Sequence, residues 1–212
     1  MKRCIIFCAG VCGETAVSIG AGDYVIAADG GLTHAERLGI TPHCILGDFD
    51  SLGYVPENSA VFPVEKDDTD SMLAVKQGLA LGYRQFVIYG GMEGPRLDHT
   101  IANLQTLQYL ADRHAQGWLV GRDTMATALK EGSVSFPASA DGTISLFCMG
   151  KDAKDVTIQG LKYPLTQGTL TAGHPLGVSN HFIGEPATIT VGQGSVLILY
   201  PKEVGFRPTT LC

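Results

Sequence analysis

The most constraining feature of this sequence is a change of pattern near residue 130. Before it, continuously apolar runs, typical of strands buried on both faces, alternate with segments of helical periodicity. The predicted strands are residues 4–8, 24–28, 44–46, 86–89 and 118–120, and the predicted helices are 33–38, 71–81 and 100–111. Strands that alternate with helices predict an α/β domain with a parallel sheet over residues 1–130.

After residue 130 the apolar runs are short and helical periodicity is missing. The runs are residues 134–136, 143–147, 155–158, 187–191 and 195–200, with Gly, Pro, Asp and Asn between them. Strands at this spacing predict an all-β second domain, a small sandwich or barrel, over residues 131–212.

Charge and hydropathy exclude several classes of protein. The chain has 15 Lys and Arg against 21 Asp and Glu, a formal net charge of −6, which disfavours a nucleic-acid partner. No apolar run approaches the roughly 18 residues needed to span a bilayer, so we expect no membrane partner.

The start of the chain has two interpretations. Lys2 and Arg3 followed by apolar residues resemble a short signal peptide, but Gly10, Gly13 and Glu14 interrupt the run. We therefore expect a buried first strand. The six cysteines lack the spacing of a metal site, which favours buried thiols in a reducing cytoplasm.

Four motifs rich in acids and glycines follow the predicted strands or open the predicted helices. They are Asp29-Gly30-Gly31, Gly47-Asp48-Phe49-Asp50-Ser51, Lys66-Asp67-Asp68-Thr69-Asp70 and Gly90-Gly91-Met92-Glu93-Gly94-Pro95-Arg96-Leu97-Asp98-His99. Because ligands of open α/β sheets bind at the carboxyl ends of the strands, these motifs predict a functional site at that edge.

The acids are of the kind that binds Mg²⁺. Asp48 and Asp50 would lie on one side of an extended segment, and Mg²⁺ binds through one or two carboxylates together with substrate phosphates. Turn formation explains the same residues equally well. Asp67, Asp68 and Asp70 could cap the following helix, but three acids are more than capping needs.

The glycine-rich loop supplies the complementary phosphate-binding features. Backbone N–H groups at Gly90, Gly91 and Gly94 could cradle phosphate, and Arg96 could contact it bidentately. Asp98 could cap a helix, hold a metal or accept a hydroxyl proton. The common nucleotide-binding sequences G-x-x-x-x-G-K-[ST] and G-x-G-x-x-G do not occur.

Taken together with Ala102-Asn103 and Ser179-Asn180, these motifs resemble, in order and spacing, those of the thiamine pyrophosphokinase family. The resemblance covers nearly the whole chain. It implies a Rossmann-like ATP-binding domain (1–130), a thiamine-binding β-sandwich (131–212) and transfer of the β,γ-diphosphate of ATP to the hydroxyethyl group of thiamine, leaving AMP. It also implies a homodimer with thiamine at the interface and Mg²⁺ as the cofactor.

The resemblance further implies roles for individual residues. Asp48, Asp50 and Asp70 would hold Mg²⁺, and Asp48, Asp70 and Asp98 would be catalytic, with Asp98 or Asp70 as the base. The residues expected to bind ATP or thiamine are Asp29, Gly30, Asp50, Lys66, Asp67, Asp68, Thr69, Gly90, Gly91, Arg96, His99, Ser179 and Asn180. Pro95 departs from the glycine often found in the family's loop and removes one backbone donor.

Other interpretations remain open at this point. Asp48-x-Asp50 is also typical of aspartyl-nucleophile phosphatases and of Mg²⁺-dependent nucleotide-sugar transferases, and a thiamine or nucleotide sensor without turnover is a third possibility. Tyr163, Phe182 and Trp118 are candidates for an aromatic contact with the thiamine cation, with core packing as the alternative for each.

Overall fold

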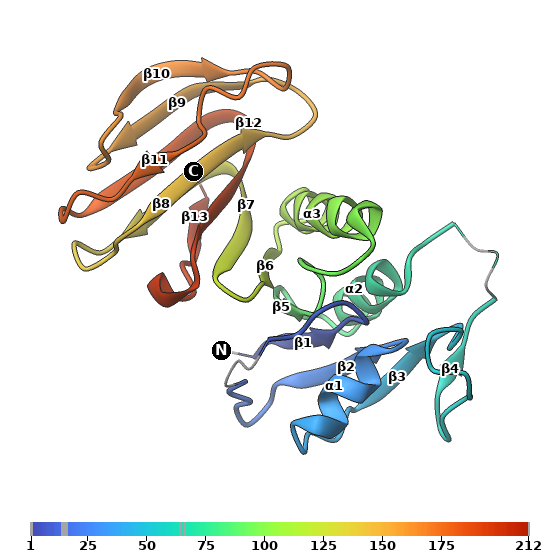
Figure 1. The fold of residues 1–212 in the computed structure, drawn as a ribbon. Helices are drawn as coiled ribbons and strands as arrows, with labels where there is room; N and C mark the ends of the chain where they lie inside the picture. Colours follow the sequence, from blue (N-terminus) through green and yellow to red (C-terminus); the bar gives the residue numbers. More distant parts are fainter. Residues whose placement is uncertain (1, 14–16, 64, 66, 212) are drawn as a thin grey trace. The chain divides into compact units, whose positions relative to one another are not determined.

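The structure, a computed structural model, describes residues 2–13, 17–63, 65 and 67–211 (Figure 1). It is a mixed α/β protein with a large sheet and few helices. The elements are β1 (Cys4–Phe7), β2 (Tyr24–Ala28), α1 (Gly31–Arg37), β3 (Cys44–Gly47), β4 (Ala60–Val61), α2 (Asp70–Ala80), β5 (Gln85–Tyr89), α3 (Leu97–Ala111), β6 (Gln116–Val120), β7 (Thr124–Phe136), β8 (Thr143–Cys148), β9 (Ala153–Gln159), β10 (Leu165–Leu170), β11 (Asn180–His181), β12 (Ala187–Pro201), the 3₁₀ helix η1 (Lys202–Val204) and β13 (Thr209–Leu211). The chain divides into two compact units, Met1–Thr106 with Leu119–Arg122, and Leu107–Trp118 with Asp123–Cys212.

The first unit contains a parallel sheet. Its strands lie in the order β5-β1-β2-β3-β4, and every neighbouring pair is parallel. The side chains of β1 are at most 1% exposed, as expected for a strand covered on both faces. The predicted first strand is therefore confirmed, and its carboxyl end lies at the same edge as those of β2, β3 and β5.

Two helices cover the sheet, and glycines allow their close approach. Figure 1 shows α1 and α2 on opposite sides of the strands. A Cβ atom at Gly31, the first residue of α1, would lie 2.0 Å from the Phe7 carbonyl oxygen. A Cβ atom at Gly78 of α2 would lie 2.8 Å from the Cys4 sulfur. Glycine at both positions brings the helices directly against β1.

The second unit is mainly antiparallel. Its longest strand, β12, pairs with β7 along most of its length, while its first half also pairs with β9 and its second half with β8. β10 pairs with β9, β11 with β8 and β13 with β7. The ring of Phe136 packs against Phe182 and Tyr200, with ring centroids 5.3 and 5.4 Å apart. The strands predicted after residue 130 are present, together with the 3₁₀ helix η1.

Several boundaries differ from the sequence-based prediction. β7 begins at Thr124, so residue 130 lies inside a strand. The separately predicted strands 187–191 and 195–200 form the single strand β12, which keeps one partner through an irregularity between Val191 and Ser195. The glycines between these two runs are typical of a turn. Residues before and after them both pair with β7, so the glycines form a bulge within one strand.

No helix in the described ranges is both long and apolar enough to cross a bilayer.

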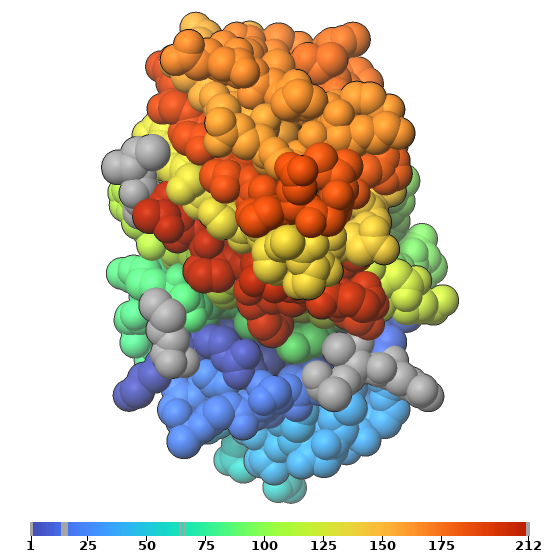
Figure 2. Space-filling view, turned by 90° about the vertical axis from the view of Figure 1, so that its left-hand side faces the viewer, coloured from blue at the N-terminus to red at the C-terminus, as the bar shows by residue number. Residues whose placement is uncertain are grey.

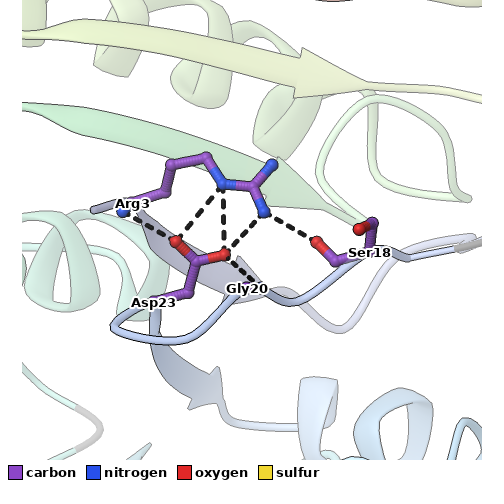
Figure 3. A network of polar contacts seen from close by, with 4 residues as sticks. All are labelled: Arg3, Ser18, Gly20 and Asp23. Atoms are coloured by element: carbon purple, nitrogen blue, oxygen red, sulfur yellow. Dashed lines mark hydrogen bonds and ion pairs between the residues drawn. The ribbon is translucent and has the colours of Figure 1, made fainter. Parts of the chain in front are cut away.

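A partly buried ion pair joins the starts of β1 and β2 (Figure 3). The Arg3 guanidinium donates to the Asp23 carboxylate at 2.6 Å, and the backbone N–H groups of Arg3 and Gly20 donate to the same carboxylate at 2.9 and 2.8 Å. The guanidinium also donates to the Ser18 carbonyl oxygen at 2.7 Å. Burial alone would raise the pKa of Asp23, but these hydrogen bonds and the Arg3 charge outweigh it and lower the pKa.

Replacing Asp23 with asparagine should lower the free energy of unfolding by about 2 kcal/mol at neutral pH, because the variant leaves Arg3 without its buried anion. The wild-type pKa lies below the ordinary 3.8, so the pair stabilises fully above the unfolded-state pKa and this contribution is lost as the pH falls through the folded-state pKa. Urea unfolding should therefore show a constant difference above about pH 5 and a shrinking one below about pH 4. A difference that does not vary with pH would contradict this account.

Candidate active site

The parallel sheet brings the predicted motifs to one edge. Asp29 directly follows β2, Asp48 follows β3, and Gly90 follows β5. Because β2, β3 and β5 all run parallel to β1, these residues leave the sheet on the same side. The predicted placement at the carboxyl ends of the strands is confirmed for the motifs that contain Asp29 and Asp48.

Asp29, Asp48 and Asp50 form a carboxylate cluster, in which one oxygen of each lies within 4.8 Å of the others. The backbone is shaped for it. Asp29 and Phe49 have φ angles of 49° and 61°, and the buried Phe49 ring anchors the loop between the two other acids. A Cβ atom at Gly47 would lie 3.1 Å from the Asp29 Cα, so glycine lets the end of β3 approach Asp29.

The cluster has the donor chemistry of a divalent cation site. Asp29 is buried, and its Oδ1 atom has no hydrogen-bond partner among the described residues. Asp48 is half-buried and accepts a 3.3 Å hydrogen bond from the Asp50 N–H. Three carboxylates this close repel one another, and oxygen-rich sites of this kind fit Mg²⁺.

The composition of this cluster differs from the predicted metal set. Asp29, which we had expected among the residues that bind ATP or thiamine, lies beside Asp48 and Asp50, whereas Asp70 is not part of the cluster. The sequence contains one signal for a place of Asp29 in this cluster: Asp29 follows the carboxyl end of β2, the strand next to β3. A role of Asp70 as a metal ligand stays a prediction.

Asp70 lies at the start of α2. The helix cap is Thr69, whose Oγ1 accepts the Met72 N–H at 3.2 Å. Asp70 lies near the thiol of Cys8; burial chiefly, and then the charge of Asp70, raises the pKa of this thiol to about 12. A thiol with such a pKa is protonated at neutral pH, which excludes Cys8 as a nucleophile.

The other members of the acidic motif have separate environments. Asp68 accepts a 2.6 Å hydrogen bond from the ammonium group of Lys76, and Asp67 is exposed. The predicted contact of Lys66 with phosphate lies outside the described residues.

The glycine loop is tightly packed against the loop that follows β1. Gly90 has a φ angle of 67°, and a Cβ atom there would lie 2.3 Å from the Cys8 carbonyl oxygen. The Gly10 N–H donates to the Gly90 carbonyl at 2.9 Å and the Val11 N–H to the Glu93 carbonyl at 2.8 Å. These glycines therefore have a packing role in addition to the phosphate binding that we predict.

Arg96 and Asp98 form an exposed bidentate ion pair at the start of α3. The guanidinium donates to the two carboxylate oxygens at 3.0 and 2.7 Å. These hydrogen bonds, helped by the charges of Arg96 and His99, lower the pKa of Asp98 to about 2. The pKa of Arg96 is raised by Asp98 and, to a smaller extent, by the charge of Asp50, which places Arg96 within electrostatic reach of the carboxylate cluster.

An Arg96→Gln variant should return the pKa of Asp98 from about 2 toward its ordinary 3.8, because the hydrogen bonds that favour the charged form are lost. The carboxyl would then protonate as the pH falls through about 4 rather than about 2. Titration of the Asp98 carboxyl carbon by NMR measures this directly, with Arg113→Gln as a control. A midpoint that stays near 2 would assign the shift to the helix terminus instead.

Ser179 and Asn180 belong to the second unit. Ser179 is exposed, with a φ angle of 60°, and its N–H donates to the Ser145 hydroxyl at 3.1 Å. The buried Asn180 amide accepts the Tyr163 N–H at 2.9 Å and donates to the Tyr163 carbonyl at 2.7 Å. Asn180 thus holds the backbone of Tyr163, whose side chain is 58% exposed.

The other two candidate aromatics are core residues. Trp118 and Phe182 are 3% and 6% exposed, and they pack against Phe206 and Phe136. Core packing, the alternative given for each, is therefore confirmed. Tyr163 lies in the segment between β9 and β10. These two strands and the segment between them belong to the orange part of the surface in Figure 2.

The second unit also has a surface hollow of about 300 Å³, which contains none of the predicted site residues. Asp141, Glu203 and Arg207 line it. The Arg207 guanidinium donates to the Val204 carbonyl at 3.0 Å and is therefore held by the chain itself.

Comparison with known proteins gives a consistent result over most of the chain. Residues 18–119 match the family model described as "Thiamin pyrophosphokinase, catalytic domain", and residues 133–196 match "Thiamin pyrophosphokinase, vitamin B1 binding domain". Thiamine pyrophosphokinase of Bacillus subtilis (strain 168) is 27% identical over 183 residues, which are 82% of this chain and 85% of the relative.

Solved structures show the same fold. Thiamine pyrophosphokinase from Bacillus subtilis superposes with a TM-score of 0.80 at 24% identity, over 95% of this chain and 99% of that one. The enzyme from Geobacillus thermodenitrificans gives 0.75 at 24% identity, over 95% and 97%. The Candida albicans enzyme gives 0.73 at 14% identity, over 94% and 88%.

Proposed function

Because the chain belongs to the thiamine pyrophosphokinase family, we propose that it transfers the β,γ-diphosphate of ATP to the hydroxyethyl group of thiamine, giving thiamine diphosphate and AMP. The family and the enzyme class, a transferase, were both predicted from the motifs and are confirmed. What the family does not specify is which side chains of this chain carry the reaction.

The observation that carries the proposal is the cluster of Asp29, Asp48 and Asp50, whose oxygens lie within 4.8 Å of one another. These residues would hold Mg²⁺, which neutralises phosphate charge when bound. The buried Oδ1 atom of Asp29, which has no hydrogen-bond partner among the described residues, supports this assignment because such an atom normally has a partner. Asp70 at the start of α2 is proposed as a further ligand.

The remaining groups orient the substrates. Arg96, exposed and near Asp50, would contact the polyphosphate bidentately. A carboxylate with a pKa of about 2 is ionised at neutral pH but is a weak base. While it is paired with Arg96, Asp98 therefore suits orientation of the attacking hydroxyl better than proton abstraction, and Asp70 is the other candidate for the base.

The glycine loop and neighbouring residues complete the proposed nucleotide site. Gly30, Thr69, Gly90, Gly91 and His99 would surround ATP, together with Lys66, Asp67 and Asp68.

The finer architecture is part of the same proposal. We assign residues 1–130 to a Rossmann-like ATP-binding domain and residues 131–212 to a β-sandwich that binds thiamine through Ser179 and Asn180. The exposed Tyr163 ring, with the Lys162 ammonium 5.5 Å from its centroid, would offer an aromatic face. A homodimer in the cytoplasm, with thiamine at the interface, follows from the family resemblance.

Three other functions have less support. A phosphatase or a nucleotide-sugar transferase would account for Asp48-x-Asp50 but not for the two matched family models. A sensor without turnover would have no use for three mutually repelling carboxylates.

The proposal is tested by incubating the purified protein with thiamine, ATP and Mg²⁺ and separating the products by chromatography. Equal amounts of AMP and thiamine diphosphate are expected. ADP with thiamine monophosphate would overturn the diphosphate transfer. Binding of thiamine without turnover would favour the sensor, and phosphate release from simple esters or turnover of a sugar nucleotide would favour the other two classes.

A further inference from the structure

A buried chain of hydrogen bonds connects the start of α2 with the glycine loop. The Ser71 hydroxyl donates to the Asn103 carbonyl oxygen at 2.6 Å, and the Asn103 amide nitrogen donates to the Gly91 carbonyl at 2.8 Å. The Thr69 hydroxyl lies 3.0 Å from that of Ser71. Ser71 and Asn103 are 9% and 5% exposed, so water does not compete for these bonds.

The direction of each bond is determined by its neighbours. The Gly91 carbonyl can only accept, so the Asn103 NH₂ group must face it and the amide oxygen must face Ser71. Ser71 therefore uses its proton on Asn103, and the Thr69 hydroxyl donates to Ser71. The Thr69 oxygen in turn accepts the Met72 N–H. Each member of the chain has one role, so none can turn without losing a bond.

The chain connects two parts of the proposed active site. Asp70 lies between Thr69 and Ser71, so the residues on both sides of it are held. At the other end, a Cβ atom at Gly91 would lie 3.0 Å from the Asn103 amide nitrogen, so the Gly91 backbone packs directly against Asn103.

We propose that Ser71 and Asn103 are positioning residues, which fix Asp70 relative to the glycine loop through the Thr69–Ser71–Asn103–Gly91 chain. This inference rests on the proposed function. Apolar side chains could hold α2 and α3 together equally well, but directional bonds also fix the rotation of each element. Catalysis of phosphoryl transfer depends mostly on such positioning.

The test compares Ser71→Ala with Ser71→Thr, which keeps the hydroxyl, and with Thr106→Val. Thr106 is a matched control because its buried hydroxyl donates to the Ala102 carbonyl within α3 and is not part of the chain. Ser71→Ala should speed amide hydrogen exchange about fivefold at residues 90–94, although the substitution is in α2, because one link of the chain is lost. Ser71→Thr and Thr106→Val should leave exchange there unchanged.

Steady-state kinetics provide the second measurement. Ser71→Ala should lower kcat about tenfold, and Ser71→Thr should restore it. A misplacement of 1 Å can cost about 10²-fold in rate, and the displacement of Asp70 expected here is smaller than 1 Å. Faster exchange confined to α2, or equal losses in Ser71→Ala and Thr106→Val, would overturn the positioning role. Absence of turnover in the wild type would overturn the proposed function instead, and the exchange at residues 90–94 would still decide the inference.

Discussion

An Asp48→Asn variant should lose about 10³-fold in kcat while folding normally, because it removes one charge from the carboxylate cluster. Asp48 lies within 4.8 Å of both Asp29 and Asp50. Asparagine keeps an oxygen that can accept the Asp50 N–H, which now donates to Asp48 at 3.3 Å, so the loop should keep its shape. Asp48 is only half-buried, so relief of the repulsion should raise the free energy of unfolding by no more than about 0.5 kcal/mol.

Three measurements separate this from a folding defect: kcat at saturating Mg²⁺, Mn²⁺ binding by calorimetry, and urea unfolding. Asp152→Asn is the control, since this exposed acid belongs to the second unit and its replacement should change none of them. Near-normal turnover in Asp48→Asn would remove this residue from the catalytic site. Lost turnover with unchanged Mn²⁺ binding would assign the metal to other ligands.

The parts of the fold that the sequence predicts well are those set by local pattern. The strands β1, β2, β3 and β5, which are buried over at least half of their length, appear as continuous apolar runs because both faces of the sheet are covered. The edge strand β4 was not predicted, since its two exposed residues carry no pattern. Residues 124–133 of β7 were also not predicted, because pairing with β12, far along the chain, defines them.

The same distinction holds for the site. The meeting of Asp29 with Asp48 follows from parallel strands and could have been inferred from their positions. The Arg96–Asp98 pair is local, at a separation of two residues. The Ser71–Asn103 bond joins residues 32 apart, and no pattern in one sequence identifies such a partner. A hydrogen bond between side chains of two different helices can be identified only from the packed structure.

The carboxylate cluster has a thermodynamic cost, which the position of Asp29 makes measurable. Asp29 is buried, and its Oδ1 atom has no hydrogen-bond partner among the described residues, while two further carboxylates lie nearby. Asparagine tolerates the φ angle of 49° found at this position. Asp29→Asn should therefore raise the free energy of unfolding by about 1–2 kcal/mol without metal, because a buried and repelled charge is removed.

The same substitution should lower kcat about 10²-fold, since a proposed metal ligand is weakened, so stability and activity should change in opposite directions. Urea unfolding in EDTA and in saturating Mg²⁺ tests this. Mg²⁺ should stabilise the wild type more than the variant, because a ligand that binds the folded state more tightly stabilises it more at the same concentration. The gap seen in EDTA should therefore close or reverse. A variant that is less stable in EDTA would show that Asp29 has a structural partner and would argue against the cluster as a cation site.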